Sequence, residues 1–130
     1  MKYRDWYNSE ILNKIKKIGY NCENKRHYVI DYNDPFDDPD GEYVAIPTPR
    51  EFIEWVLSKG EYYIAVSPEP HYDFDYVFTY NVWELSYDDH YDLKFYDLKL
   101  HKSNFRTYQE AYEQAAYDLL MKITDSNGKI

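Results

Sequence analysis

The stretch HYDFDYVFTYNVW (residues 71–83) decides the fold, because large apolar side chains occupy every second position of it. Successive side chains of an extended strand point to opposite faces of a sheet, so this period of two predicts a long β-strand. Most of the intervening side chains are polar, which is typical of an antiparallel sheet with one buried and one solvated face. The face expected to be buried comprises Tyr72, Phe74, Tyr76, Phe78, Tyr80 and Val82.

Strands are also expected before and after this stretch. EYYIAVS (residues 61–67) has the same period of two, and Pro68 and Pro70 predict a turn between it and the long strand. RHYVIDY (residues 26–32) alternates in the same way and predicts an earlier strand.

The stretch YDLKFYDLKL (residues 91–100) predicts the last strand and contains an internal repeat. Its unit YDLK recurs after five residues, an odd number, so the apolar face would change sides between the two copies. Leu98 and Leu100 would then share the face opposite to that of the first copy. A β-bulge near Phe95 and Tyr96 would reconcile the two phases, and the alternative is a strand covered on both sides.

Three helices are predicted by apolar residues that recur at three- and four-residue steps. The first spans residues 3–18 and is followed by Gly19, which suits the left-handed conformation at a helix end. The second begins in TPRE (residues 48–51), where the threonine and the glutamate form a capping box and the proline suits the first helical position. A second Thr-x-x-Glu box, at Thr107, begins the last helix.

The predicted order of elements is therefore α-β-α-β-β-β-α. This order indicates an α+β domain, an antiparallel sheet of about four strands with two to three helices packed mainly on one face. Residues 1–124 are expected to form this single domain, and residues 125–130 a frayed C-terminal tail.

The net charge of −9 is unevenly distributed along the 130 residues. Residues 1–26 have a net charge of +4 and residues 94–130 of +1, whereas residues 27–93 have −14. This acidic block disfavours direct binding to nucleic acid, because phosphate groups are neutralised by clustered Lys and Arg. No apolar run is long enough for a membrane span or a signal core, so a cytoplasmic location without a membrane partner is expected.

The chain contains 17 tyrosines, more than a core is expected to bury with every hydroxyl group satisfied. Tyrosine is enriched at protein–protein contacts, and an acidic surface suits a basic protein partner. A compositional bias towards Tyr, Asp, Asn and Lys together is the other explanation. The candidate partner-binding residues are Asp34, Asp37, Asp38, Asp40 and Glu42 of the acidic loop DYNDPFDDPDGEY (residues 31–43), together with Asp73, Asp75, Tyr63 and Tyr87.

A divalent-metal site is the alternative to a partner-binding surface. The tripeptide His-Tyr-Asp occurs at residues 71–73 and 90–92, and a strand presents its first and third residues on one face. A hairpin that turns near Tyr87 would bring the first copy close to the histidine at position 101. The acidic loop lacks the first and last ligands of an EF-hand, so that motif is excluded, whereas a looser Ca²⁺ site in residues 34–40 stays open. No catalytic residue or cofactor is assigned. The candidate metal ligands are His71, Asp73 and His101.

The C-terminal stretch NFRTYQEAYEQAAYDLLMKI (residues 104–123) resembles the closing segment of small uncharacterised proteins from gut bacteria and their phages. The shared features are an aromatic residue, a Thr-Tyr start and a helix with alanines four residues apart. The resemblance covers this stretch alone; it implies a phage or mobile-element setting and no catalytic residues. The matching residues are Phe105, Thr107, Tyr108, Ala111 and Ala115.

Three functional hypotheses follow from the charge, the tyrosines and the histidines. The first is a non-enzymatic protein whose acidic, tyrosine-bearing face binds a basic protein; one form of it is a phage or mobile-element inhibitor that mimics the charge of nucleic acid. The second is a divalent-metal-binding or metal-dependent hydrolytic domain. The third is a structural subunit of a phage particle. The sequence leaves the oligomeric state open.

Overall fold

The computed structural model describes residues 6–20 and 46–126. In these residues three antiparallel strands form one sheet in the order β1-β2-β3, accompanied by three helices, so the predicted α+β class is confirmed. The elements are α2 (Ser9–Lys17), α3 (Pro49–Ser58), β1 (Tyr62–Pro70), β2 (Tyr76–Tyr87), β3 (Leu93–Phe105) and α4 (Tyr108–Asp125).

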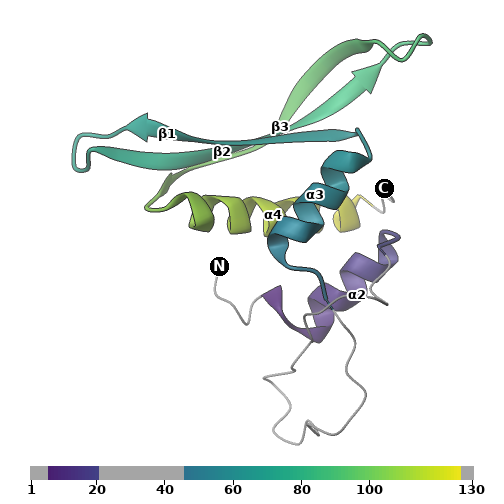
Figure 1. Ribbon diagram of the computed structural model, residues 1–130, viewed down its shortest axis with the longest axis horizontal. Helices are drawn as coiled ribbons and strands as arrows, with labels where there is room; N and C mark the ends of the chain where they lie inside the picture. The colour runs from purple at the N-terminus through teal and green to yellow at the C-terminus, as the bar shows by residue number, and fades with distance from the viewer. Residues whose placement is uncertain (1–5, 21–45, 127–130) are drawn as a thin grey trace, which may run out of the picture.

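The three helices lie on one face of the sheet (Figure 1). Helix α4 runs beneath the strands, α3 crosses beside it, and α2 lies farther from the sheet (Figure 1). The order of these elements matches the predicted order, whereas the strand predicted at residues 26–32 and the acidic loop at 31–43 lie outside the described residues.

The turn between β1 and β2 lies later in the chain than Pro68 and Pro70 predicted. Strand β1 continues through both prolines, and the turn occupies residues 71–75. Proline is tolerated there because β1 is an edge strand, where a missing N–H need not break the ladder. Tyr72, predicted on the buried face of the strand, is consequently in the turn and fully exposed.

The hairpin of β2 and β3 turns at residues 88–92, with Tyr87 paired to Leu93. The pairing register shifts at Lys94, an extra residue of β3 that has no paired position on β2, close to the bulge predicted near Phe95 and Tyr96. A second shift passes over Lys99. A third lies near Asn104, which has a positive φ of 69°.

The shift at Lys99 corrects the prediction that Leu98 and Leu100 share a face. Leu98 pairs with Trp83 and Leu100 with Val82, and these two neighbours on β2 point to opposite sides of the sheet. The leucines therefore point to opposite faces as well, because the extra residue between them reverses the alternation.

The helix ends follow the predicted capping signals. The Thr48 hydroxyl accepts a hydrogen bond from the Glu51 backbone N–H, and the Glu51 carboxylate accepts one from the Thr48 backbone N–H, so the capping box is confirmed. At α4 the Thr107 hydroxyl accepts from the Glu110 N–H, whereas the Glu110 carboxylate accepts from Arg106 N, one residue before the cap.

The outer ends of the first and last helices differ from the predicted ranges. Helix α2 has Asn8 as its N-cap, whereas the sequence predicted a start at residue 3. Gly19 after it has a φ of 100°, the left-handed conformation expected there. Helix α4 continues to Asp125, one residue into the predicted tail, and residues 127–130 lie outside the described part.

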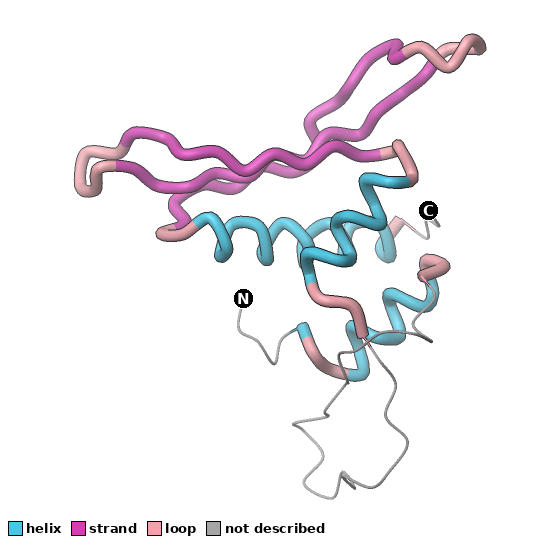
Figure 2. The backbone as a smooth tube through the Cα atoms, viewed as in Figure 1, coloured by secondary structure: helices cyan, strands magenta, loops and turns pink. Residues whose placement is uncertain are grey.

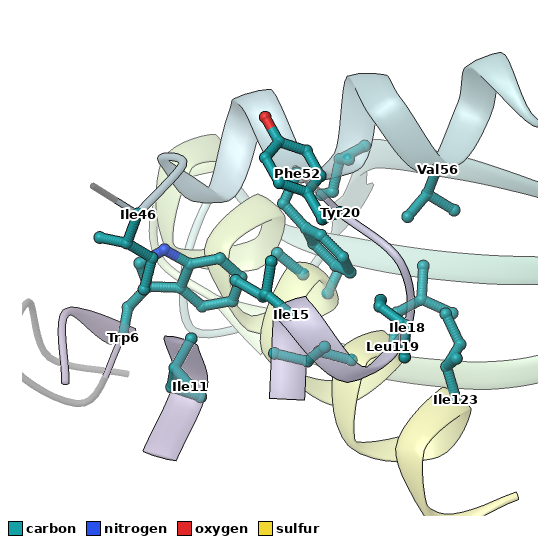
Figure 3. Packing of buried hydrophobic residues seen from close by; sticks show 14 of the residues in the cluster. Trp6, Ile11, Ile15, Ile18, Tyr20, Ile46, Phe52, Val56, Leu119 and Ile123 are labelled. Atoms are coloured by element: carbon teal, nitrogen blue, oxygen red, sulfur yellow. The ribbon is translucent and has the colours of Figure 1, made fainter. Parts of the chain in front are cut away.

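The hydrophobic core lies between the sheet and the helices and extends to α2 (Figure 3). Trp6 is completely buried; its indole N–H donates to the Pro47 carbonyl at 2.9 Å, and its ring lies 5.7 Å from that of Phe52. Small residues on α4 let its backbone approach the sheet, since Ala115 and Ala116 are fully buried. The largest fully buried side chains are Trp6, Tyr80, Phe52, Ile11, Ile15, Ile18, Ile46, Ile53, Leu119, Leu120, Val56 and Val82.

A polar network fastens α4 to the sheet at Asp118. The buried Tyr80 of β2 donates its hydroxyl hydrogen to the Asp118 carboxylate. Lys102 of β3 forms an ion pair with the same carboxylate at 2.9 Å, and the Gln114 amide donates to it at 2.9 Å. The network thus joins three elements that the core also holds together. Burial, and then the Asp118 carboxylate, raise the pKa of the Tyr80 phenol.

This raised pKa predicts a loss of stability at alkaline pH. Above about pH 10, where tyrosine ionises in the unfolded chain, Tyr80 stays protonated in the folded state, so each further pH unit lowers the free energy of unfolding by up to about 1.4 kcal/mol. Urea unfolding between about pH 8 and about pH 11 is expected to show a shallower decline for Tyr80→Phe than for the wild type. The exposed Tyr72→Phe is the control, and parallel curves for all three proteins would contradict the prediction.

Candidate protein-interaction surface

The face of the sheet opposite the helices, here the outer face, is covered by none of the described elements (Figure 1). Towards the β1–β2 turn this face is polar. Thr79 and Ser103 share a hydrogen bond of 2.8 Å between their hydroxyl oxygens, and His101 Nδ1 lies 2.6 Å from Asn81 Oδ1. This half of the outer face therefore satisfies its polar groups across strands and presents little apolar surface.

The other half of the outer face carries a group of large apolar side chains, here the outer-face cluster. The pairing of the three strands brings them together, because directly paired residues point to the same side of a sheet. Four members are between 50% and 65% exposed, namely Tyr63, Leu93, Tyr96 and Leu98. The cluster comprises Tyr63, Trp83, Leu85, Leu93, Tyr96 and Leu98.

A recess of about 370 Å³ lies in this cluster, lined by Tyr63, Trp83, Leu85, Leu93 and Tyr96. The ring centroids of the paired Tyr63 and Trp83 are 5.8 Å apart. Beyond β1 the hairpin of β2 and β3 continues as an arm that leaves the sheet on the side away from the helices (Figure 2). Adjacent exposed apolar side chains on a free face are typical of a contact surface.

The end of the arm is an ordered acidic turn, here the acidic tip, made of residues 88–92. Asp88 Oδ1 accepts hydrogen bonds from the backbone N–H groups of His90 and Asp92, at 2.9 and 3.0 Å. Tyr91 has a positive φ of 63°, and its side chain is 90% exposed. The turn therefore holds the carboxylates of Asp88, Asp89 and Asp92 and the Tyr91 ring in solvent next to the outer-face cluster.

The arm as a whole is acidic, and three of its acids belong to the tip. Residues 84–97 contain five Asp or Glu and one lysine, a net charge of −4. Lys99 Nζ lies 2.9 Å from the Asp97 carboxylate, whose hydrogen bond and charge raise the pKa of this lysine. Burial raises the pKa of Tyr62, and the neighbouring Glu84 and Glu61 raise it further. Positive charge on an approaching partner would therefore be attracted to the arm.

The predicted partner-binding residues lie in several places. Tyr63 is part of the outer-face cluster, and Tyr87 is half-exposed at the base of the acidic tip, where its hydroxyl donates to the Gly60 carbonyl at 2.7 Å. Asp73 and Asp75 are exposed in the β1–β2 turn, at the opposite end of β2 and so roughly 35 Å from the tip. The predicted residues outside the described part are Asp34, Asp37, Asp38, Asp40 and Glu42.

The structure does not bring together the predicted metal ligands His71, Asp73 and His101. His71 and Asp73 lie in the β1–β2 turn, where His71 Nδ1 accepts a hydrogen bond from the Asp73 backbone N–H at 3.1 Å. His101 pairs with Asn81, five residues into β2 and roughly 17 Å from that turn. The hairpin turns at residues 88–92, directly after Tyr87, and this turn together with the register shifts in β3 places His101 opposite Asn81 and away from the β1–β2 turn. Within residues 6–20 and 46–126 no three His, Cys, Asp or Glu side chains are placed to hold a metal ion.

A groove of about 810 Å³ lies on the helix side, between α3, the first turns of α4 and β1. Ile64 contributes to its floor, and the stacked rings of Tyr108 and Tyr112 form part of its wall. Burial and the nearby Tyr108 and Glu54 raise the pKa of Tyr112. Arg50 and Glu54 pair at 3.2 Å beside it, so the groove contains both charges. Unlike the acidic arm, it has no marked preference for one ligand charge.

Five of the six residues of the outer-face cluster were not among the sequence candidates. Trp83 falls on the mixed face of the long strand, where its large aromatic side chain among polar ones was the signal that could have indicated a contact residue. Leu85 follows it with the same period. Leu93 and Leu98 belong to the repeat, where the position of the bulges decides which side they face. The five are Trp83, Leu85, Leu93, Tyr96 and Leu98.

Comparisons with models of protein families, with curated proteins and with solved structures found no match. None of the described helices is both long and apolar enough to span a membrane.

Proposed function

We propose that this chain is a non-enzymatic binding protein that captures a basic protein through the outer-face cluster and the acidic tip. The observation that carries the proposal is the recess of about 370 Å³, whose aromatic and leucine side chains stay exposed next to three carboxylates of the tip. Aromatic anchors surrounded by charged groups are the usual composition of a protein contact.

A macromolecular partner fits this surface better than a small molecule does. Small-molecule sites add convergent polar groups to an apolar pocket in order to fix the ligand's orientation. Here the recess is lined by Tyr63, Trp83, Leu85, Leu93 and Tyr96, and the charged groups lie beyond its rim, in the tip. A nucleic acid is disfavoured because the arm is negatively charged.

The proposal places the contact at the arm and not along the whole acidic block. The described acids of the two turns, at residues 71–75 and 88–92, lie at opposite ends of β2 and do not form a continuous strip. A partner bound at one end of the sheet can contact the charged tip and the apolar outer-face cluster at the same time. An inhibitor from a phage or mobile element is the setting that the resemblance of residues 104–123 favours for such a protein.

Affinity capture followed by titration of the purified partner tests the proposal. We expect the double variant Leu93→Ser/Tyr96→Ser to bind about 30-fold more weakly, because it removes two large exposed contact groups without disturbing the core. Raising the salt concentration from about 0.05 to about 0.3 M is expected to weaken wild-type binding, since the tip attracts the partner through exposed charges.

The matched control is Tyr72→Ser, which alters a fully exposed tyrosine in the opposite turn and is expected to leave the affinity unchanged. Circular dichroism of each variant verifies that the fold is retained. A captured partner that is acidic, or that binds the double variant as tightly as the wild type, would refute the proposal.

A further inference from the structure

We infer that the segment of the partner that contacts the arm is a basic amphipathic helix lying across the outer-face cluster, not a strand added to an edge of the sheet. This inference rests on the proposed function and specifies the partner's chemistry. Three features of the molecule support it: the construction of the two sheet edges, the spacing within the cluster and the distribution of charge.

The edge formed by β3 is poorly suited to pair with another strand. Its ladder with β2 shifts register at three places, near Lys94, Lys99 and Asn104. Each shift bends the strand and disturbs the regular spacing of N–H and C=O groups that an added strand would need. Lysines on an edge strand further disfavour strand addition. Such an edge protects the sheet against pairing rather than inviting it.

The edge formed by β1 is interrupted in a different way. Pro68 and Pro70 occupy the last part of this strand and have no backbone N–H to donate. An extended segment could pair fully only with the first two thirds of β1, from Tyr62 to Ser67. The β3 edge is thus irregular along its length and the β1 edge is unsuitable over its last third, whereas the outer face is a surface that a regular element can cover.

The spacing within the cluster fits a helix. Trp83 and Leu85 are two residues apart on one strand, so their rows of side chains are about 7 Å apart. The turns of an α-helix repeat every 5.4 Å, and apolar side chains three or four positions apart would enter neighbouring rows. The recess between Tyr63, Trp83 and Leu85 then receives the first of these anchors.

Charge sets the composition of the rest of the helix. Asp88 lies three residues beyond Leu85 along the chain, about 10 Å farther towards the tip. A helix covers this distance in about two turns, so Lys or Arg placed two turns from the apolar anchors would reach the tip's carboxylates. The expected segment therefore has an apolar stripe with basic residues towards one end.

A second copy of the chain does not meet this requirement. If two outer faces packed with their arms aligned, one acidic tip would face the other. If they packed in opposite directions, each tip would face the β1–β2 turn of the other copy, with Asp73 and Asp75 exposed. Like charges brought together in this way oppose association in both arrangements. The occupant is therefore a different, basic polypeptide.

Three synthetic Leu/Lys peptides of about 18 residues test the inference, each long enough for a stable helix on binding. The first has leucines at a helical period and the second has the same residues alternating as in a strand. The third is the first peptide with a central proline, which interrupts the helix at nearly the same charge. Fluorescence anisotropy measures each against the whole wild-type chain, the Leu93→Ser/Tyr96→Ser variant and the Tyr72→Ser control.

The helical peptide is expected to bind the wild type at least about tenfold more tightly than the other two peptides do. Its affinity is expected to be at least about tenfold lower for Leu93→Ser/Tyr96→Ser and unchanged for Tyr72→Ser. The contrary outcome is that all three peptides bind with equal affinity, in a salt-sensitive way, and still bind the double variant more weakly than the wild type. That result would overturn the helix inference and leave the basic-partner proposal standing. No binding of any peptide, or binding that the double variant does not weaken, would count against both.

Discussion

Replacing Trp6 with alanine is expected to lower the free energy of unfolding by about 3–5 kcal/mol, the largest effect predicted for a single substitution in this chain. The indole is completely buried and packs against Phe52 of α3, next to Ile46 (Figure 3). Its removal leaves a cavity, and the Pro47 carbonyl loses the hydrogen bond it accepts at 2.9 Å. Urea unfolding monitored by far-ultraviolet circular dichroism measures the change.

Trp6→Phe separates the two contributions. It keeps an aromatic ring in the same site and removes the N–H, so a smaller loss of about 1–2 kcal/mol is expected. If Trp6→Ala were no more destabilising than a substitution at the exposed Tyr72, the docking of residues 6–20 onto α3 would be wrong. The variant thus tests the part of the fold that lies farthest from the sheet.

Replacing Asp118 with alanine is expected to cost about 3 kcal/mol, the second largest effect. The carboxylate accepts hydrogen bonds from the Tyr80 hydroxyl and the Gln114 amide and pairs with Lys102, all from a half-buried position on α4. Without it the hydroxyl of the fully buried Tyr80 has lost its acceptor, and an unpaired buried polar group is costly.

Asp118→Asn is the matched variant, because an amide oxygen can still accept from Tyr80 while the ion pair with Lys102 is lost. Since Lys102 is about half-exposed, its pair is worth little, and Asp118→Asn is expected to cost about 1 kcal/mol or less. Equal destabilisation by the two substitutions in thermal unfolding would show that charge, and not acceptance from Tyr80, decides the role of Asp118.

These stabilising residues and the proposed contact lie in different parts of the molecule. Trp6 and Asp118 act in the helix layer and at its junction with the sheet, whereas Leu93 and Tyr96 are exposed on the arm. Substitutions on the arm are therefore expected to change binding without unfolding the protein. A loss of binding by an arm variant in the capture and peptide experiments therefore reports on the contact and not on unfolding.

Helix starts and strands that depend on residues a few positions apart could be predicted from the sequence. The capping residues Thr48, Glu51 and Thr107 predicted two helix starts, since a cap is formed by groups three residues apart. The period of two in residues 71–83 predicted a strand, although its first five residues belong to a turn. The turn predicted at Pro68 and Pro70 was placed too early in the chain, because an edge strand tolerates proline, which a central strand would not.

The candidate surface was less predictable, because it depends on register. Tyr63 was selected from the sequence, whereas Leu93 and Leu98 were not, since the pairing with β2 decides which way they point. One extra residue in β3 reverses the alternation; the five-residue repeat predicted a bulge close to Lys94, whereas no local signal marked the second one, at Lys99. The metal set His71, Asp73 and His101 required His101 near the β1–β2 turn, but the turn at residues 88–92 and the register shifts in β3 place it opposite Asn81.

The sequence by itself determined the α+β class, the apolar stripes of the helices and the excess of negative charge, because each depends on composition or on spacing within a few residues. Only the tertiary structure decided which side chains lie together on the outer face, and that acidic residues far apart in one block occupy opposite ends of β2. Strand pairing joins residues 63, 83 and 98, which are distant in the chain, and its register is fixed by bulges and turns acting together.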